Sequence, residues 1–313
     1  MPRKIIIDTD PGQDDAVAIL VALASPEELD VLGLVCVAGN VPLARNVRNA
    51  LKVVELSGRT EVPVYAGCER PLRRHLVTAE YVHGDTGLDG PDLPEPDIDV
   101  QPQHGVDFII DTIMAEEPGA VTLCALGPLT NIAIALVKQP AIAERIQQIV
   151  LMGGGYFEGG NVTPAAEFNI YVDPDAADVV LRAGIPTVMA PLDLTHMMLS
   201  TPERLERIKG LGNRSGTAVY EMLTFSERFD LVKYGGQGAP LHDPCVIAYL
   251  LEPGLFEGRH INVTVETGSE LTMGMTVADY WGVTGRARNV HFLRSGDAEG
   301  FYQLLTERLG RLP

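Results

Sequence analysis

The sequence is poor in positive charge, in aromatic side chains and in cysteine. Its 313 residues carry 24 Lys and Arg against 42 Asp and Glu, a formal net charge of −18, and only 6% are aromatic. A chain this acidic repels the phosphate backbone, so nucleic acid is not expected as a partner. Cys36, Cys68, Cys124 and Cys245 lie far apart and form no CxxC pair. A reduced, cytoplasmic protein is therefore expected.

Long apolar runs are missing as well. The longest uncharged run, Val121 to Val137, is shorter than a bilayer span and contains Gly127, Pro128 and Asn131. At the N-terminus three isoleucines precede the first aspartate, too few for the apolar region of a signal peptide. We expect neither a membrane segment nor a secretion signal.

What the chain does contain is ordinary globular composition, with 46% hydrophobic and 21% charged residues. Short β-rich runs alternate with longer segments of helical period, which predicts an α/β fold with an open, doubly wound, mostly parallel sheet and helices on both faces. No linker interrupts residues 1–313, so one domain is expected. The predicted strands are Lys4 to Ile7, Val31 to Val37, Val62 to Tyr65, Val121 to Leu126, Ile146 to Met152 and Thr187 to Ala190. The predicted helices between them are Asp14 to Ala24, Ala44 to Leu56, Val106 to Glu117, Leu129 to Lys138 and Asp175 to Ala183.

Two regions depart from this alternation. Gly67 to Gln103 is rich in Gly, Pro, Asp and Arg without a sustained period, which predicts a long surface segment of the kind that forms lids or binding loops. After Ser200, helices are predicted at 202–209 and 215–232, and a Gly-rich loop then leads into 241–251. Extended runs at 260–266 and 290–293 and a closing helix follow.

The most informative segment is DTDPGQDD, residues 8–15, which follows the first strand. Active sites of doubly wound sheets lie at the carboxyl ends of the strands. Two like charges 4 Å apart repel by about 4 kcal/mol at an effective dielectric constant near 20, so converging carboxylates need a cation or shared protons. Oxygen ligands favour Ca²⁺ or Mg²⁺, and no EF-hand loop follows. The alternative is that Asp14 and Asp15 cap a helix while Asp8 and Asp10 form a turn.

The same segment closely resembles the amino-terminal motif of the nucleoside hydrolases, the inosine-uridine-preferring nucleoside hydrolase family. The resemblance extends over nearly the whole chain as an ordered series of short blocks, and that order makes it specific. The further blocks are Ala38-Gly39-Asn40, His83-Gly84 with Gly87-Leu88, Leu126 to Asn131, Met152 to Gly155, Asn161-Val162 with Glu167-Phe168-Asn169, and Gly238 to Pro244.

This resemblance implies a Ca²⁺-dependent enzyme that hydrolyses ribonucleosides to ribose and free base. By similarity, Asp10, Asp15, the backbone carbonyl of Leu126 and Asp243 would hold the metal, and Asp10 would activate a metal-bound water. Leu126 replaces the threonine of some members, but only its carbonyl is needed. Members are commonly homotetramers or dimers, so a homo-oligomer is expected. Asp243 before Pro244 also suits a helix N-cap, and both roles are compatible.

The resemblance further implies a ribose site, which suits amide side chains because they offer both donors and an acceptor. Its residues are Asp14, Asn40, Asn161, Glu167 and Asn169, with Met152 near the sugar. For residues 161–169 the alternative is a hairpin that carries surface amides. The preceding GGGYFEGG does not match a GxGxxG dinucleotide motif.

Candidates for contact with the leaving base come from two parts of the chain. His242 is a candidate to protonate or orient the base, because histidine titrates near neutrality, and His83 is a second candidate. A structural role is the alternative for each. Four residues just ahead of His242 are candidates for the base pocket, with core packing as the alternative. They are Phe225, Arg228, Phe229 and Tyr234.

Two other functions fit parts of the sequence. Asp8-x-Asp10 after a strand imitates the nucleophile and acid of haloacid dehalogenase-like phosphatases, but Gly12 replaces the Thr or Val of that motif and Asp14 and Asp15 would lack a role. A non-catalytic, Ca²⁺-dependent nucleoside or sugar-binding protein is the second alternative. The presence of Asp10 as a plausible base favours catalysis over binding alone.

Overall fold

Three consecutive isoleucines in β1 (Arg3–Thr9) show how the central sheet is buried. Ile5 and Ile7 pack into a hydrophobic cluster on one face, Ile6 packs into a cluster on the other, and all three are fully buried. Side chains alternate between the two faces of a strand, so a strand with helices on both sides must be apolar throughout. The computed structural model describes residues 1–236 and 238–313, and the side chains of all of these except Asp230 and Tyr234.

The described residues form a nine-stranded sheet in the order β10-β9-β11-β6-β5-β4-β1-β2-β3. Every pair from β11 to β3 is parallel, whereas β9 runs antiparallel to both β11 and β10. The remaining strands are β2 (Leu29–Cys36), β3 (Val64–Ala66), β4 (Val121–Ala125), β5 (Ile146–Met152), β6 (Thr187–Ala190), β9 (Phe256–Val265), β10 (Thr276–Asp279) and β11 (Val290–Gly296). A separate antiparallel ribbon pairs β7 (Leu199–Ser200) with β8 (Ala239–Pro240).

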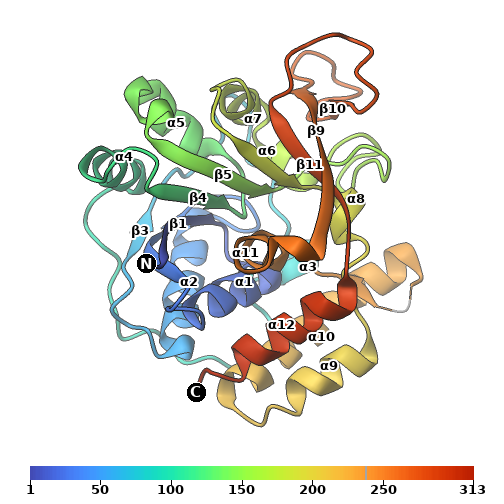
Figure 1. The fold of residues 1–313 in the computed structure, drawn as a ribbon. Coiled ribbons are helices and arrows are strands. Elements are labelled where there is room, and N and C mark those ends of the chain that lie inside the picture. The colour runs from blue at the N-terminus through green and yellow to red at the C-terminus, as the bar shows by residue number, and fades with distance from the viewer. Residues whose placement is uncertain (237) are drawn as a thin grey trace.

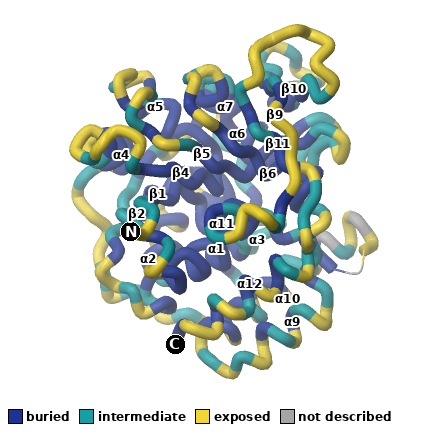
Figure 2. The backbone as a smooth tube through the Cα atoms, viewed as in Figure 1, coloured by how far each residue is buried: buried dark blue, intermediate teal, exposed yellow. Residues whose placement is uncertain are grey.

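Helices cover both faces of the sheet (Figure 1). One face carries α1 (Gln13–Leu23), α2 (Leu43–Ser57), α9 (Pro202–Lys209), α10 (Arg214–Tyr234), α11 (Pro244–Leu251) and α12 (Ala298–Leu309). The other carries α4 (Gly105–Ala115), α5 (Thr130–Lys138) and α7 (Pro174–Leu181). Short helices are α3 (Glu80–His83), α6 (Phe168–Val172) and α8 (Leu192–Thr195), with 3₁₀ turns at Pro140–Glu144 and Pro253–Leu255. Figure 2 shows the buried strands at the centre and the exposed residues on the outer turns.

The predicted α/β architecture is confirmed. All six predicted strands and the five helices between them are present, and each boundary lies within a few residues of the prediction. Within residues 241–251 the helix begins at Pro244, which the sequence also favoured as its first position. Proline lacks the N–H that an interior helical position needs and fits the first turn, so residues 241–243 stay outside the helix.

The strand order places a topological switch point between β1 and β4. From β1 the chain adds β2 and β3 on one side, then crosses to add β4, β5 and β6 on the other. Ligands of doubly wound sheets bind at the carboxyl ends of the strands next to such a point. Asp10 follows β1 and Leu126 follows β4, so both lie at this position. No helix among the described residues is long and apolar enough to cross a membrane.

Candidate active site

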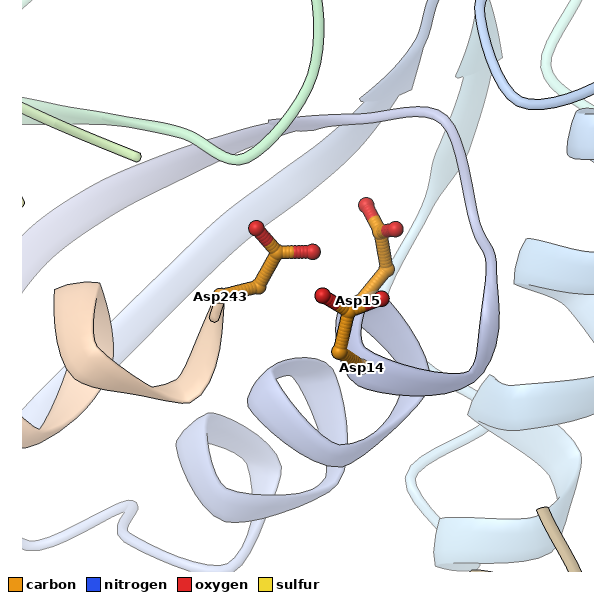
Figure 3. Close-up of side chains that lie close together, drawn as sticks. All are labelled: Asp14, Asp15 and Asp243. Atoms are coloured by element: carbon orange, nitrogen blue, oxygen red, sulfur yellow. The ribbon is translucent and has the colours of Figure 1, made fainter. Parts of the chain in front are cut away.

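Three carboxylates meet where helices α1 and α11 begin. Asp14 and Asp15 lie in the first turn of α1, and Asp243 directly precedes α11. Figure 3 shows the three side chains close together, and one carboxylate oxygen from each lies within 4.8 Å of the other two. Asp15 and Asp243 are buried and Asp14 is half-buried. The packing of α1 against α11 therefore joins acidic residues from opposite ends of the chain.

Asp10 lies buried beside this cluster. Its Oδ2 accepts a hydrogen bond from the backbone N–H of Asn40 at 2.7 Å, whereas its Oδ1 is buried without a partner among the described residues. Two glycines make room for the carboxylate: a Cβ on Gly39 would lie 2.0 Å from Oδ2, and one on Gly127 would lie 2.3 Å from Oδ1. A buried polar atom without a partner is costly, so Oδ1 is an acceptor available to a ligand.

Asp15 is held in place by hydrogen bonds to its carboxylate. Its Oδ1 accepts from the hydroxyl of Thr9 at 2.5 Å and from the backbone N–H of Asp10 at 3.2 Å. Its Oδ2 accepts from the backbone N–H of Gly12 at 3.0 Å and from Nδ2 of Asn40 at 3.3 Å. The helix-capping role weighed for Asp15 is therefore real, and it coexists with the carboxylate cluster.

The electrostatics of the cluster favour a bound cation. Burial raises the pKa of Asp10 and of Asp243 well above the usual range, and the neighbouring carboxylates raise both pKa values further. Burial also raises the pKa of Asp14 and of Asp15, and for Asp15 the charge of Asp14 adds to this rise. A hard divalent cation would remove this repulsion and use oxygen ligands only. The unpartnered Oδ1 of Asp10 and the all-oxygen donor set fit such an ion.

Two of the four predicted metal ligands lie in the carboxylate cluster, with one difference from expectation. Asp15 and Asp243 belong to the three-carboxylate cluster, whose third member is Asp14, a residue predicted to bind ribose. Asp10 lies next to the cluster. The carbonyl oxygen of Leu126 accepts a hydrogen bond from Nδ2 of Asn169 at 2.7 Å. A predicted metal ligand is therefore in direct contact with a residue predicted to bind ribose.

All seven residues predicted to bind substrate line one cavity. Leu126, His242 and Asp243 also line it. The seven are Asp14, Asn40, His83, Met152, Asn161, Glu167 and Asn169. The hairpin with surface amides that was weighed for residues 161–169 is therefore wrong, because three of these side chains lie in the cavity wall.

The amides in the wall are oriented by their own hydrogen bonds. Nδ2 of Asn40 donates to the carbonyl oxygen of Asp10 at 2.9 Å, and Nδ2 of Asn169 donates to that of Leu126. Because each Nδ2 donates to a carbonyl oxygen, the Oδ1 atom of each side chain is oriented away from that carbonyl and can accept a hydrogen bond. Asn161 is the reverse case: its Oδ1 accepts the backbone N–H of Phe168 at 2.9 Å, so its amide N–H groups are the ones available.

Glu167 has a structural role in addition to its place in the cavity wall. Its Oε1 accepts the backbone N–H of Asn169 at 2.8 Å, and its Oε2 accepts those of Gly154 at 2.9 Å and Ile170 at 3.2 Å. The side chain thus caps α6 and fixes the Gly-rich turn after β5. Burial nevertheless raises the pKa of Glu167 to about 7.

His242 and Asp243 reach the cavity because β8 ends at Pro240 and α11 begins at Pro244. Nδ1 of His242 lies 2.7 Å from the hydroxyl of Thr195. Burial lowers the pKa of His242 to about 3, so the imidazole is neutral at pH 7 and offers a hydrogen bond rather than a proton. The predicted N-cap role of Asp243 is wrong: its side chain makes no capping hydrogen bond and joins the carboxylate cluster instead.

The side of the cavity expected to receive the base is formed by α3 and α10. Phe229 lines the cavity, and Tyr81 packs edge-on against it with ring centroids 5.3 Å apart. Arg228 lies over the ring of Phe225, 3.7 Å from its centroid, and neither is among the described residues of the wall. The side chain of Tyr234 lies outside the described part of the chain. The long segment 67–103 supplies Ala79 and residues 81–83 to the wall, as expected of a binding loop.

Sequence reasoning missed several residues of the site. Gln13 lies inside the acidic motif but carries no charge, and Thr195 lies far from it in the chain. Apolar wall residues such as Phe168 and Leu223 carry no sequence signal that separates them from core residues. Gln13 was discoverable, since it is the one amide side chain in the acidic motif of residues 8–15.

Asp8 does not reach this cavity. It is 1% exposed, and its Oδ2 accepts Nδ2 of Asn131 at 2.8 Å. Burial raises the pKa of Asp8 to about 8. A phosphatase that used an Asp8 nucleophile with an Asp10 acid would need both carboxylates to face the substrate.

The fold and the cavity together define an α/β enzyme whose site lies at the switch point of a parallel sheet. The model of the inosine-uridine preferring nucleoside hydrolase family matches residues 5–303, and the chain belongs to this family. An uncharacterized protein of Schizosaccharomyces pombe is 53% identical over 310 residues, 99% of this chain and 100% of that protein. The pyrimidine-specific ribonucleoside hydrolase RihA of Photobacterium profundum is 47% identical over 310 residues, 99% of both chains.

A solved structure agrees with this assignment. The purine-preferring ribonucleoside hydrolase from Gardnerella vaginalis superposes with a TM-score of 0.92 at 32% sequence identity, over 98% of each chain. The chain is thus an enzyme of the nucleoside hydrolase class. The phosphatase and the non-catalytic binding protein weighed from the sequence are both set aside by this membership.

Proposed function

We propose that the protein hydrolyses the N-glycosidic bond of ribonucleosides to ribose and free nucleobase, with Ca²⁺ as its cofactor. The observation that carries this proposal is the buried carboxylate cluster beside Asp10, which opens onto a cavity lined by oriented amides. The relatives named above support the reaction class. They differ in the base that their names give, so both purine and pyrimidine nucleosides are candidate substrates.

The proposed metal ligands are Asp10, Asp15, the carbonyl oxygen of Leu126 and Asp243. Asp14 is close enough to take part as well. Ca²⁺ suits this set better than Mg²⁺, because Mg²⁺ demands a small octahedral site whereas Ca²⁺ accepts six to eight oxygens in flexible geometry. When bound, the ion would orient the attacking water and offer two coordination positions to the vicinal hydroxyls of ribose.

Asp10 is proposed as the general base. Its Oδ2 is fixed by Asn40 and its Oδ1 has no partner among the described residues, so one oxygen is held while the other is able to take a proton. Water attacks the anomeric carbon, the C–N bond breaks through an oxocarbenium-like state, and Asp10 accepts the proton of the water. The electron pair of that bond leaves with the base, which His242 and His83 are proposed to orient.

Ribose is proposed to bind between the carboxylate cluster and the amides. Oδ1 of Asn40 and of Asn169 would accept from hydroxyls, and the amide of Asn161 would donate to one. Glu167 would accept from a hydroxyl with its remaining lone pairs, with Met152 packed beneath the sugar.

The protein is further proposed to be a cytoplasmic homo-oligomer. All four cysteines are free, which suits a reducing compartment. Leu271, Trp281 and Val283 are 86%, 72% and 85% exposed and lie in the two connections that flank β10, so a second chain could cover them. Light scattering during size exclusion tests this proposal, and a monomer at micromolar concentration contradicts it.

The decisive experiment is to incubate the protein with inosine, uridine, cytidine and adenosine and to measure released reducing sugar. Activity should disappear after prolonged dialysis against excess chelator and return when Ca²⁺ is added. Full activity in the chelator would refute the metal assignment. Tight nucleoside binding without release of ribose would refute the proposed hydrolysis of these substrates.

A further inference from the structure

We infer that Gln13 is a positioning residue that fixes the ring of His83, in one tautomer, against the leaving nucleobase. This inference rests on the proposed function. Gln13 is the first residue of α1 and is 1% exposed, and its neighbours Asp14 and Asp15 carry the carboxylate cluster. Gln13 turns away from the cluster, toward the segment that contains His83.

Three hydrogen bonds join Gln13 to that segment. Its Nε2 donates to the carbonyl oxygens of His83 and Asp89, both at 3.0 Å. Its Oε1 lies 2.6 Å from Nδ1 of His83. One buried amide thus binds both the backbone and the ring of a residue 70 positions away in the chain, and it ties the cavity wall to the first turn of α1.

These contacts decide the tautomer of His83. Both carbonyl oxygens can only accept, so the NH₂ group of Gln13 must face them and its Oε1 must face the ring. Oε1 is itself only an acceptor, so Nδ1 of His83 must carry the proton. In a neutral ring Nε2 then has a lone pair and no proton. Burial lowers the pKa of His83 to about 4, which favours this neutral form.

The ring is held from a second side by Gly12. A Cβ at Gly12 would lie 2.5 Å from Nδ1 and 2.7 Å from Cε1 of His83, so the imidazole packs directly against the backbone at the start of α1. Gln13 and Gly12 fix the Nδ1 edge of the ring, and His83 lines the cavity, so Nε2 is the ring nitrogen that is left for a ligand. His83 therefore offers the cavity a hydrogen-bond acceptor in a defined place.

An acceptor in this place selects leaving groups that present an N–H. Uracil, hypoxanthine and the amino group of cytosine all carry one, whereas 4-nitrophenolate carries none and departs without help from a hydrogen bond. Loss of Gln13 should therefore slow the cleavage of nucleosides but not of 4-nitrophenyl β-D-riboside. Comparing nucleosides with 4-nitrophenyl β-D-riboside therefore distinguishes a defect in contact with the base from a defect in metal or ribose binding.

The first experiment compares wild type, Gln13→Met, His83→Ala and the double variant on uridine, inosine and 4-nitrophenyl β-D-riboside. Methionine keeps the length of the side chain and removes its hydrogen bonds. We expect kcat/KM of Gln13→Met to fall about tenfold on the nucleosides, the size expected from losing a small hydrogen-bond network, and to stay within about twofold on the nitrophenyl riboside. The double variant should be no worse than His83→Ala, because Gln13 acts through that ring.

Three results would overturn the inference. An equal loss of kcat/KM on all substrates in Gln13→Met would mean that Gln13 supports the carboxylate cluster. Additive losses in the double variant would mean that Gln13 acts apart from His83. No loss in Gln13→Met would mean that Gln13 has no role in turnover. If wild type cleaves none of these substrates, the proposed function fails instead.

A second measurement needs no variant enzyme to be active. In ¹⁵N-labelled wild-type protein, NMR correlation of imidazole nitrogens with ring protons distinguishes the two neutral tautomers, and the His83 signals are assigned by their disappearance in His83→Ala. We expect a protonated Nδ1 and an unprotonated Nε2 at pH 7. A protonated Nε2, or rapid averaging of the two tautomers, contradicts the inference whether or not Gln13→Met folds.

Discussion

Oδ1 of Asp10 occupies the space that a side chain at Gly127 would need, since a Cβ built there lies 2.3 Å from this oxygen. Gly127 follows β4 and Asp10 follows β1, so the neighbouring strand ends meet at this point. At this switch point of the sheet the backbone of Gly127 approaches the buried carboxylate of Asp10 closely. The position of the Asp10 carboxylate therefore requires a residue without a side chain at position 127.

The first prediction follows from this contact. Gly127→Ala should push the Asp10 carboxylate from its place, at a stability cost of about 1–3 kcal/mol for overpacking. We expect turnover to fall at least about tenfold, because general base catalysis depends on hydrogen-bond geometry. The matched control is Gly254→Ala, where an added Cβ meets nothing within 4 Å. Equal activity of the two variants would contradict the tight fit around Asp10.

The second prediction concerns the chemistry of Asp10. Asp10→Asn keeps the shape of the side chain and removes the base, so kcat should fall by about 10²–10⁴-fold. Asp10→Ala should abolish turnover and leave the fold intact, as judged by circular dichroism. Asp30→Asn is the control for the loss of one negative charge, because Asp30 is exposed on β2. Near-normal hydrolysis by Asp10→Asn would rule out its role as base.

The third prediction links pH to metal binding. Burial and mutual repulsion raise the folded-state pKa values of Asp10, Asp14, Asp15 and Asp243 above the unfolded value of 3.8. The folded, metal-free protein therefore holds more protons than the unfolded chain. The resulting contribution to stability is fully present below about pH 4 and is lost as pH rises through the folded pKa values.

In the proposed site Ca²⁺ would replace these protons, so the stabilisation that it gives should grow with pH. We expect the difference in melting temperature between protein in Ca²⁺ and protein in chelator to increase steadily from pH 5 to pH 8. Asp243→Asn should flatten this dependence, because it removes one of the repelling charges. A difference that stays constant with pH, or that shrinks, would argue against binding of the ion by these carboxylates.

The sequence was most informative where one physical rule dominates. The Ile5-Ile6-Ile7 run could only be a strand buried on both faces, and the acidic motif after it could only lie at the carboxyl end of the sheet. The start of α11 at Pro244 was predictable because proline suits the first turn of a helix. The short β7–β8 ribbon and α3 are held by tertiary contacts, and local sequence carries little information about such elements.

The site was predictable in its charged members and not in its neutral ones. Asp14 and Asp15 were recognisable as members of a dense acidic motif, whereas Asp243, far along the chain, was identified through the family resemblance. Asp14 joins the cluster and Asp10 lies beside it because of the way α1 packs against α11. No local sequence pattern encodes this packing. The contact between Gln13 and His83 likewise spans 70 positions and exists only in the folded chain.

The last prediction concerns the sugar. Nδ2 of Asn40 and of Asn169 each donates to a carbonyl oxygen, and the Oδ1 atom of each is proposed to accept from a ribose hydroxyl. A 2′-deoxyriboside leaves such an acceptor unpaired and also loses one of the two hydroxyls that a bound ion would grip. A site built to hydrogen-bond a hydroxyl rejects the analogue without it by up to about 10⁴-fold. We therefore expect kcat/KM for uridine to exceed that for 2′-deoxyuridine by at least about 10²-fold, measured as released base.

In Asn169→Leu this ratio should fall, because the variant loses more activity on the riboside than on the deoxyriboside. Equal rates on the two nucleosides in wild type would contradict recognition of the vicinal diol.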